Sequence, residues 1–330
     1  MRFLEFFKKN WLHVFVLTKK DIGLANNNRH GNLCVAQHYC NLTISIQIPG
    51  YWQHGFFIDP DYFPQDELEF AKKYGLKLYV WDEQIGACLL RNNFKNFRII
   101  GAPFIYLPPP EDYTKKSLTA NRLLYVPTHS LKQESIKFDW DSTIDYLIDT
   151  VGKKYDVTML LYYLDYSDFN LNERLKFRCA SAGIRVETLG YVHDDNFLYK
   201  LRTYLMSYDV LGSEIFSTTL IYGAFLGLRV FVGGPTKYVM EMSNSAYFNK
   251  FSEHVESYGI YLNQLNQYYQ KKYPSFFVHP DESTTNVLVG KQLLGFNYKL
   301  KSTEMKIEFG WIGILTFLIQ KYISLKSILK

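Results

Sequence analysis

The stretch from Tyr208 to Val232 constrains the fold more than any other part of the chain. It reads as a buried strand, a sharp turn at Gly212 and Ser213, a short helix, and a second buried strand at 229–232. Gly227 is the type of residue that ends a helix in the left-handed conformation. A strand, a helix and a strand in this order are typical of a parallel sheet, so the stretch predicts one crossover of such a sheet.

The beginning of this helix predicts a phosphate site. Ser217, Thr218 and Thr219 fall in its first turns. The first turn of a helix has N–H groups without partners and the positive end of the helix dipole, and both suit a diphosphate. Hydroxyl groups add donors without charge or bulk. An ordinary capped helix uses the same residue types, so that interpretation stays open beside the phosphate site.

The same alternation of strands and helices continues along the whole chain. We expect strands at 13–17, 42–48, 76–80, 97–100, 122–126, 158–163, 185–189, 210–212 and 229–232, and helices at 66–74, 142–151, 171–182, 196–206 and 216–226. This order predicts an α/β fold with doubly wound parallel sheets, whose ligands bind beyond the carboxyl ends of the strands.

A proline-rich stretch at 107–116 predicts a linker between two domains. We expect a Rossmann-like acceptor-side domain at 1–110 and a Rossmann-like donor-binding domain at 117–300, both facing one cleft. A length of 330 residues is sufficient for two domains of ordinary size.

Charge and cysteine content exclude several classes. The net charge of +5 is mild and does not indicate a nucleic-acid-binding protein. The four cysteines have no C-x-x-C spacing, which favours free thiols in a reducing compartment and predicts neither a metal site nor a cofactor. No long uncharged apolar stretch occurs, so we expect a cytoplasmic protein without a membrane span.

The last part of the chain differs from the rest. Apolar residues, among them Trp311, recur at helical spacing, and Lys321, Lys326 and Lys330 gather at the end. This pattern predicts an amphipathic helix over 301–330. Such a helix either lies on the inner-membrane surface, which would make the protein peripheral to that membrane, or packs back on the domains.

One candidate catalytic residue follows a predicted strand of the first domain. His54 lies between Gly50 and Gly55, which allow close approach to a ligand. Its imidazole titrates near neutral pH, so it is the expected general base for an attacking hydroxyl. Gln53 and Gly55 are expected on the acceptor side of the cleft. The alternative is a histidine that only stabilises a turn.

Two carboxylates follow the next strand of this domain. Asp82 and Glu83 come directly after the expected strand at 76–80, and they are the second candidate for the base. A solvated loop explains the same residues.

Polar loops also follow two strands of the second domain. Thr128, His129 and Ser130 come after the first of them, and Ser213 with Glu214 after a later one. Hydroxyl, imidazole and carboxyl groups at these positions are expected donor-binding residues for a phosphate or a ribose. A capped loop before a helix is built from the same residues.

Several short motifs occur in a familiar order: His54-Gly55, Trp81 to Glu83, Ile100 to Pro103, Tyr125 to Ser130 and Ser213 to Thr219. In these motifs the chain resembles GT-B glycosyltransferases of bacterial surface polysaccharide synthesis. The nearer relatives in this resemblance are capsule and lipopolysaccharide enzymes allied to the CDP-glycerol glycerophosphotransferases.

The resemblance implies roles for some residues. A histidine beside a glycine, here His54, is the catalytic or phosphate-contacting group of that family. A Pro-Thr-His loop opens the second domain, here from Pro127. A late Ser/Thr pair, here Ser217 and Thr218 with Ser213 just before, holds the donor diphosphate. The Asp-Tyr-Ser-Ser form of that motif and an early His-Pro pair are absent, which leaves the donor open.

The activity implied is transfer of a sugar from a nucleotide-activated donor to a growing surface glycan or a lipid-linked acceptor. A metal-independent, inverting reaction is favoured, because Tyr222 stands where retaining enzymes of the largest group carry a second glutamate. Two alternatives are transfer of a polyol phosphate on the same fold, and a non-catalytic partner that binds a nucleotide sugar or another transferase.

Overall fold

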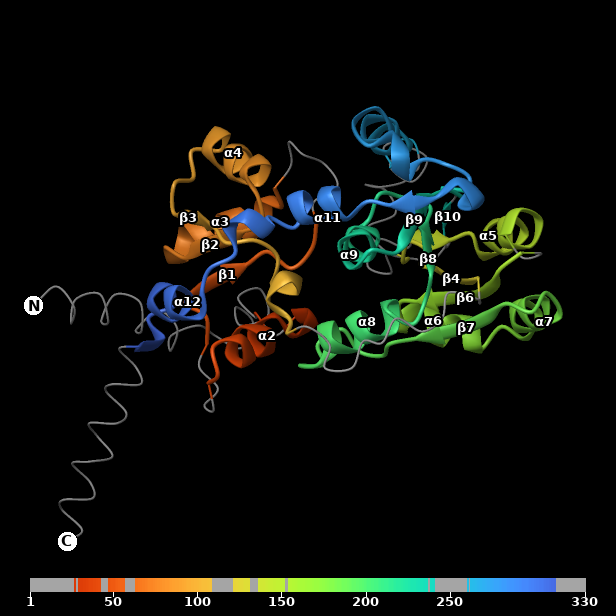
Figure 1. The fold of residues 1–330 in the computed structure, drawn as a ribbon, viewed down its shortest axis with the longest axis horizontal. Helices are drawn as coiled ribbons and strands as arrows, with labels where there is room; N and C mark the ends of the chain where they lie inside the picture. The colour runs from red at the N-terminus through yellow and green to blue at the C-terminus, as the bar shows by residue number, and fades with distance from the viewer. Residues whose placement is uncertain are drawn as a thin grey trace, which may run out of the picture. The chain divides into compact units, whose positions relative to one another are not determined.

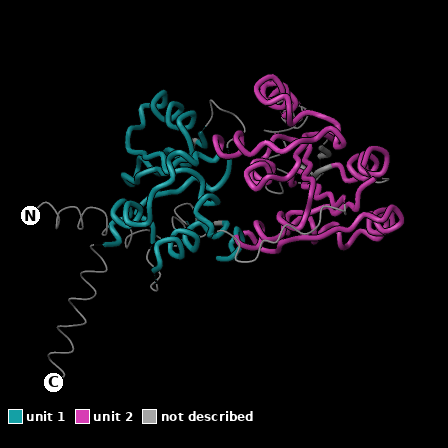
Figure 2. The backbone as a smooth tube through the Cα atoms, viewed as in Figure 1, with its two compact units in different colours: residues 1–108, 193–198, 294–330 teal, residues 109–192, 199–293 magenta. Residues whose placement is uncertain are grey.

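The computed structural model describes residues 27, 29–42, 47–56, 63–108, 121–130, 136–151, 154–236, 238–240, 260 and 262–312 (Figure 1). The chain divides into two compact units (Figure 2). Unit 1 comprises residues 1–108, 193–198 and 294–330, and unit 2 comprises residues 109–192 and 199–293. The first passage from unit 1 to unit 2 falls inside the proline-rich stretch at 107–116.

Unit 1 contains a parallel sheet of three strands in the order β1-β2-β3. Their bounds are β1 Gly50–Trp52, β2 Lys77–Val80 and β3 Phe97–Ile99, and the helices of this part are α2 Asn32–Tyr39, α3 Gln65–Tyr74 and α4 Glu83–Arg91. The expected strands at 76–80 and 97–100 and the expected helix at 66–74 are confirmed within one residue. Leu68 of α3, Leu78 and Val80 of β2 and Leu89 of α4 are fully buried, so the apolar faces of the two helices meet the sheet.

The first strand of unit 1 differs from the expectation. Residues 47 and 48 of the predicted strand at 42–48 are not in a strand, and β1 begins at Gly50. Gly50 approaches β2 so closely that a Cβ atom there would lie 2.4 Å from the carbonyl oxygen of Lys77. The alternation of apolar and polar residues at 42–48 gave a strand signal, whereas the pairing depends on the missing side chain of Gly50. Residues 43–46 and the predicted strand at 13–17 lie outside the described residues.

A later segment of the chain, from Leu294 onward, completes unit 1. The N–H of Ala102 donates to the carbonyl of Leu294 at 2.9 Å, and the N–H of Leu300 donates to the Tyr106 hydroxyl at 2.8 Å. Helix α12 (Ser302–Glu308) follows. These contacts join residues almost two hundred positions apart into one unit.

Trp311 lies in the core of unit 1. Its side chain is fully buried, its indole N–H donates to the carbonyl of Gln47 at 3.0 Å, and its ring contacts Phe309 at 5.0 Å. Of the two alternatives for the C-terminal helix, the position of Trp311 agrees with packing back on the chain and not with a place on the membrane surface. Residues 313–330, the larger part of the predicted amphipathic helix at 301–330, lie outside the described residues. No helix in the described part of the chain is long and apolar enough to cross a membrane.

Unit 2 contains a sheet of six strands in the order β11-β9-β8-β4-β6-β7, in which every pair is parallel except β11 with β9. The bounds are β4 Arg122–Tyr125, β6 Asp156–Leu161, β7 Arg185–Thr188, β8 Val210–Ser213, β9 Arg229–Val232 and β11 Thr284–Thr285. From β4 the chain adds β6 and β7 on one side, and then returns to add β8 and β9 on the other. The predicted α/β class with parallel sheets is confirmed, and the direction of winding reverses between β4 and β8.

Helices connect these strands. They are α5 Trp140–Tyr146, which continues as a π-helical turn at Leu147–Val151, α6 Tyr163–Asn170, α7 Glu173–Ser181, α8 Phe197–Leu205, α9 Thr218–Leu226 and α11 Val287–Leu293, and a two-stranded antiparallel sheet is formed by β5 Ile136–Phe138 and β10 Tyr238–Met240. Gly223 lets α9 pack directly on β8, because a Cβ atom there would lie 2.3 Å from the Leu211 side chain. The beginning of α9 is thereby fixed against the end of β8.

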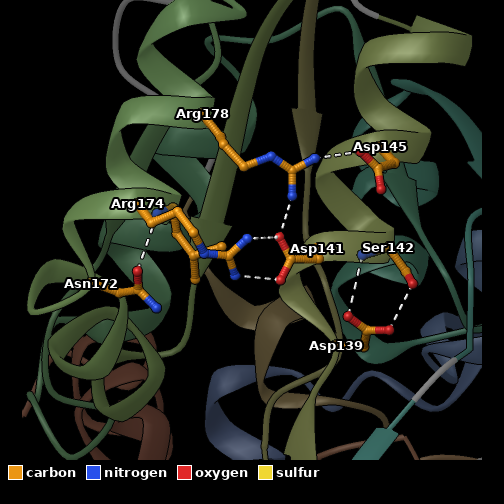
Figure 3. Close-up of polar contacts among 8 residues, drawn as sticks. Asp139, Asp141, Ser142, Asp145, Asn172, Arg174 and Arg178 are labelled. Carbon is orange, nitrogen blue, oxygen red and sulfur yellow. Dashed lines mark hydrogen bonds and ion pairs between the residues drawn. The ribbon is translucent and has the colours of Figure 1, made fainter.

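An ion-pair network joins α5 to α7 on the surface of unit 2 (Figure 3). Asp141 accepts two hydrogen bonds from Arg174, at 2.8 and 2.5 Å, and one from Arg178, which also pairs with Asp145. The arginines, first of all Arg174, hold the pKa of the Asp141 carboxyl below its usual value. We call these four residues the Asp141 network.

Candidate functional site

The site with the most unusual chemistry lies where the winding of the unit 2 sheet reverses. Glu214 follows β8 and is 1% exposed. Its Oε2 accepts a hydrogen bond from the Thr128 N–H at 2.9 Å, with the Thr128 hydroxyl at 3.4 Å. Thr128 follows β4, the strand next to β8. One carboxyl group therefore joins the two loops at the switch point, the usual place for a ligand in such sheets. We call Thr128, Ser213 and Glu214 the switch-point cluster.

The environment of Glu214 favours the uncharged acid. Burial raises the pKa of this carboxyl to about 8, although its own N–H, Thr128 and the Tyr125 hydroxyl oppose the shift through hydrogen bonding. Tyr125 and Tyr146 lie nearby, and burial, followed by the charge on Glu214, raises the pKa of the Tyr146 hydroxyl to about 12. At neutral pH the carboxyl is mostly protonated and can both donate and accept hydrogen bonds.

Two polar atoms of the switch-point cluster have no hydrogen-bond partner among the described residues. They are Oε1 of Glu214 and the hydroxyl oxygen of Ser213, and both are buried. Leaving a buried polar group unpaired costs about 1–3 kcal/mol, and native proteins do so rarely. Both atoms lie at the carboxyl end of β8, the edge at which ligands bind in sheets of this kind.

Two glycines after β9 let the chain lie against the tyrosines of this site. The Tyr125 hydroxyl donates to the carbonyl of Gly233 at 2.8 Å. A Cβ atom on Gly234 would lie 2.2 Å from the Tyr125 hydroxyl oxygen, and one on Gly233 would lie 2.6 Å from that of Tyr146. The Gly-Gly pair directly after an expected strand is a sequence signal for this close approach, and it was missed.

The N-terminus of α9 lies next in the chain. The helix begins at Thr218 rather than at Phe216, because the Phe216 N–H donates to Asn266 and leaves the helical path. Ser217 caps the helix by accepting from the Leu220 N–H at 3.4 Å, and its own hydroxyl proton can still be donated to a ligand. Gly227 ends the helix in the left-handed conformation, as the sequence predicted.

Asn266 fixes the loop between the switch-point cluster and α9. Its amide donates to the carbonyl of Glu214 at 2.8 Å and accepts from the Phe216 N–H at 3.2 Å. Ser217, Thr218 and the adjacent Thr219 are all partly exposed. The three hydroxyls predicted to bind phosphate are thus in an ordered loop and helix start, accessible to a ligand.

The loop after β4 is fixed at both ends. Thr128 is bound to Glu214, and the Ser130 N–H donates to the buried carboxylate of Asp165 at 3.0 Å. His129 lies between them with an exposed side chain, and its ring contacts Tyr162 at 5.0 Å. The structure thus brings Thr128 to Glu214 and leaves His129 accessible, whereas Ser130 is buried.

Gln53 in unit 1 has a structural role rather than the expected acceptor contact. Its side chain is 1% exposed, accepts from the Trp81 N–H at 3.2 Å and donates to the carbonyl of Gly55 at 2.8 Å. The Trp81 indole donates to the Gln53 carbonyl at 2.8 Å. These bonds hold the loop after β1 to the end of β2 and position the intervening His54.

His54 belongs to a cluster of polar rings in unit 1. Its Nδ1 lies 2.6 Å from the Tyr51 hydroxyl, which donates to Oε1 of Glu67 at 2.7 Å. The imidazole of His30 stacks on that of His54, with centroids 5.6 Å apart and planes within 5°. The Phe197 ring meets His30 edge-on at 5.4 Å. We call His30, Tyr51, His54 and Glu67 the His54 cluster. Sequence reasoning found only His54.

Asp82 and Glu83 lie at the N-terminus of α4. Asp82 accepts from the Ile85 N–H at 3.0 Å as the N-cap of α4, and Glu83 is the first residue of that helix and bonds the Tyr298 hydroxyl. Residues 81 and 82 connect β2 to α4, and the helix begins directly after Asp82, which is a favourable N-cap. A capping role explains these carboxylates without catalysis.

Within the described residues, no group of three or more His, Cys, Asp or Glu side chains is placed to hold a metal ion. No protein-family model matches the chain, and no curated protein matches it. The functional argument therefore depends on the geometry of the switch-point cluster, α9 and the His54 cluster.

Proposed function

We propose that this chain is a glycosyltransferase of the GT-B class, which transfers a sugar from a nucleotide-activated donor to a growing surface glycan or glycolipid. The observation that carries the proposal is the switch-point cluster. Buried, unpaired hydrogen-bonding atoms of Ser213 and Glu214 lie at the carboxyl edge of a doubly wound sheet, one short loop before the N-terminus of α9. A second unit with its own parallel sheet supports a two-domain enzyme.

The arrangement suits a leaving diphosphate. Fixed N–H groups and hydroxyls at the beginning of a helix stabilise negative charge as it develops on the leaving group. A charged glutamate would repel a phosphate, whereas Glu214 is buried with its pKa raised to about 8. The neutral carboxyl can donate a hydrogen bond to a phosphate oxygen or to a hydroxyl group of the donor. No metal ion is required for this stabilisation.

In this proposal His54 is the base. It takes the proton of the acceptor hydroxyl while that oxygen bonds the anomeric carbon and the bond to the diphosphate breaks. A single displacement of this kind inverts the configuration of the anomeric carbon. A positioned base contributes about 10²–10⁴-fold to the rate.

Donor binding is tested by calorimetry with CMP-, CDP-, UDP-, GDP- and dTDP-linked sugars. We expect one class to bind the wild-type chain and to bind Ser213→Ala more weakly. Ser167→Ala is the matched control, because it removes an exposed hydroxyl from α6 that donates to the Tyr163 carbonyl of the same helix. Binding of a CDP-polyol in place of any sugar donor would favour polyol-phosphate transfer, and binding of no donor would reject the proposal.

The base is tested by His54→Ala. Turnover should fall about 10²–10⁴-fold while donor affinity stays unchanged. His38→Ala, which removes an imidazole from α2 of the same unit, should keep its activity. Equal turnover of the two variants would exclude His54 as the base.

We further propose that the protein works in the cytoplasm at the inner-membrane surface, through residues 313–330. Their apolar pattern and lysines motivate this proposal, and each lysine near an anionic surface contributes about 1 kcal/mol. A chain ended after Ile312 keeps the buried Trp311, so it should fold and lose its binding to anionic vesicles. Undiminished vesicle binding by the shortened chain would contradict this placement.

A further inference from the structure

The His54 cluster contains more than a single candidate base. Tyr51 is 7% exposed, and the side chains of His54 and Glu67 are 19% and 11% exposed. They form one continuous chain of hydrogen bonds, from Glu67 through the Tyr51 hydroxyl to Nδ1 of His54, at 2.7 and 2.6 Å. Both bonds are short, which is typical when one partner carries charge.

A count of protons shows which atom donates in each of these two hydrogen bonds. The Tyr51 hydroxyl donates to Oε1 of Glu67, so its single proton lies on that bond. The Tyr51 oxygen can then only accept from His54, whose Nδ1 must carry its proton. In the neutral imidazole this leaves Nε2 with the lone pair.

We propose that Glu67 and Tyr51 are positioning residues that hold His54 as the Nδ1–H tautomer and make Nε2 the base of the reaction. This inference rests on the proposed function for the identity of the reaction, and on geometry alone for the tautomer. When Nε2 takes the acceptor proton, the imidazole becomes a cation. The Glu67 carboxylate, 3.9 Å from Nδ1, stabilises that charge.

The other neighbours of His54 limit its movement and its charge. His30 stacks on one face of the ring and is itself met edge-on by Phe197. The stacked imidazoles of His30 and His54 repel each other when both are protonated, so the cluster favours at most one cation. Among the described residues, the titratable groups in contact with His54 include His30, Tyr51 and Glu67.

The tautomer is measured without any substrate. Long-range ¹H–¹⁵N NMR spectra of the full chain, labelled at its 8 histidines, distinguish a protonated from an unprotonated ring nitrogen. The signal of His54 is assigned as the one absent from His54→Gln. We expect Nδ1 protonated and Nε2 unprotonated at neutral pH in the wild-type chain. A wild-type chain with Nε2 protonated would overturn the proposal.

A variant then reverses the chain of hydrogen bonds. In Glu67→Met the carboxylate acceptor is lost, so the Tyr51 hydroxyl should turn to Nδ1 of His54 and shift the proton to Nε2. Tyr39→Phe is the matched control, because it removes a tyrosine hydroxyl from the same unit, one that donates to the Leu300 carbonyl. The control should keep the wild-type tautomer. An unchanged tautomer in folded Glu67→Met would also overturn the proposal.

Activity provides the second measurement. In Glu67→Met the turnover should fall at least about tenfold with donor KM unchanged, within the range of a positioned base. The ascending limb of its pH–rate profile should move to lower pH, because the anion that stabilises the imidazolium is gone. Tyr39→Phe should leave the limb in place. Absence of transfer from every donor in the wild-type chain would reject the proposed function, whereas the tautomer would still be decided by NMR.

Discussion

Two acidic sites of unit 2 show opposite ways of accommodating a carboxyl group. The Asp141 side chain is 42% exposed and bonds two arginines, which lower its pKa. Glu214 is 1% exposed, bonds Thr128, and has one oxygen without a partner among the described residues. Burial raises its pKa to about 8. The first carboxyl is charged and paired, and the second is mostly neutral and incompletely bonded.

The difference indicates which site serves a function. An exposed ion pair contributes little to stability, and its loss is usually tolerated. A buried carboxyl with an unpaired oxygen lowers stability, and proteins concentrate such costs at functional sites. This contrast supports the proposed binding role for the neighbourhood of Glu214, whereas the ion pairs of the Asp141 network join α5 to α7.

The largest expected effect is on donor binding. Replacing Ser217 and Thr218 together with Ala removes two hydrogen bonds to phosphate, each about 1.5–3 kcal/mol. Donor Kd should rise at least about tenfold, as measured by calorimetry, while circular dichroism shows the fold retained. Asp141→Asn should leave Kd unchanged. An unchanged Kd in the folded double variant would mean that α9 does not bind the donor.

The next effect is on the pH dependence of stability. The pKa of Glu214 is raised in the folded state, so the stabilisation that comes from its protonation is complete below the unfolded pKa of 4.5 and is lost as pH rises through about 8. The free energy of unfolding of unit 2 should fall by on the order of 3 kcal/mol between pH 5 and pH 8.

Glu214→Gln isolates this contribution. Its amide does not titrate, so the variant should lose most of the decrease in stability over this pH range, as measured by denaturant unfolding at several pH values. If wild type and variant decline in parallel, Glu214 does not change its protonation in this range.

The smallest expected effect is on thermal stability, when the Asp141 network is broken. Asp141→Asn should lower Tm by no more than about 2 °C at low salt, because the network is exposed and solvent screens it. The difference should shrink in 1 M NaCl, where screening is nearly complete. A fall of 10 °C, measured by calorimetry, would show that the network is a principal element of the fold and remove the contrast with Glu214.

Sequence patterns were most informative where the signal is local. The buried strands of unit 2 are apolar runs, and Gly227 ends α9 because a residue without a side chain tolerates the left-handed conformation. The beginning of α9 was placed wrongly because it depends on Asn266, fifty positions away from Phe216. Of the strand expected at 42–48, the described residues 42, 47 and 48 are not in a strand, and β1 begins at Gly50.

The candidate site was predicted only in part, because its contacts also join residues that are far apart in the sequence. Thr128 and Glu214 were each found from their position after a strand, but the sequence does not show that they bond each other across 86 positions. Tyr51 and Glu67 were not predicted as site residues, because tyrosine and glutamate are common on protein surfaces. Only the folded chain places them beside His54.

The division of the chain has a consequence for its synthesis. Unit 2 ends at Leu293, whereas unit 1 begins at the N-terminus and is completed by Leu294, Leu300 and Trp311. On the ribosome, residues 47–108 of unit 1 are therefore made before unit 2, but the core of unit 1 stays incomplete until residues 294–311 have been made. Pulse proteolysis of nascent chains should find residues 121–293 protected before residues 47–108. A chaperone that shields exposed apolar surface would act on unit 1.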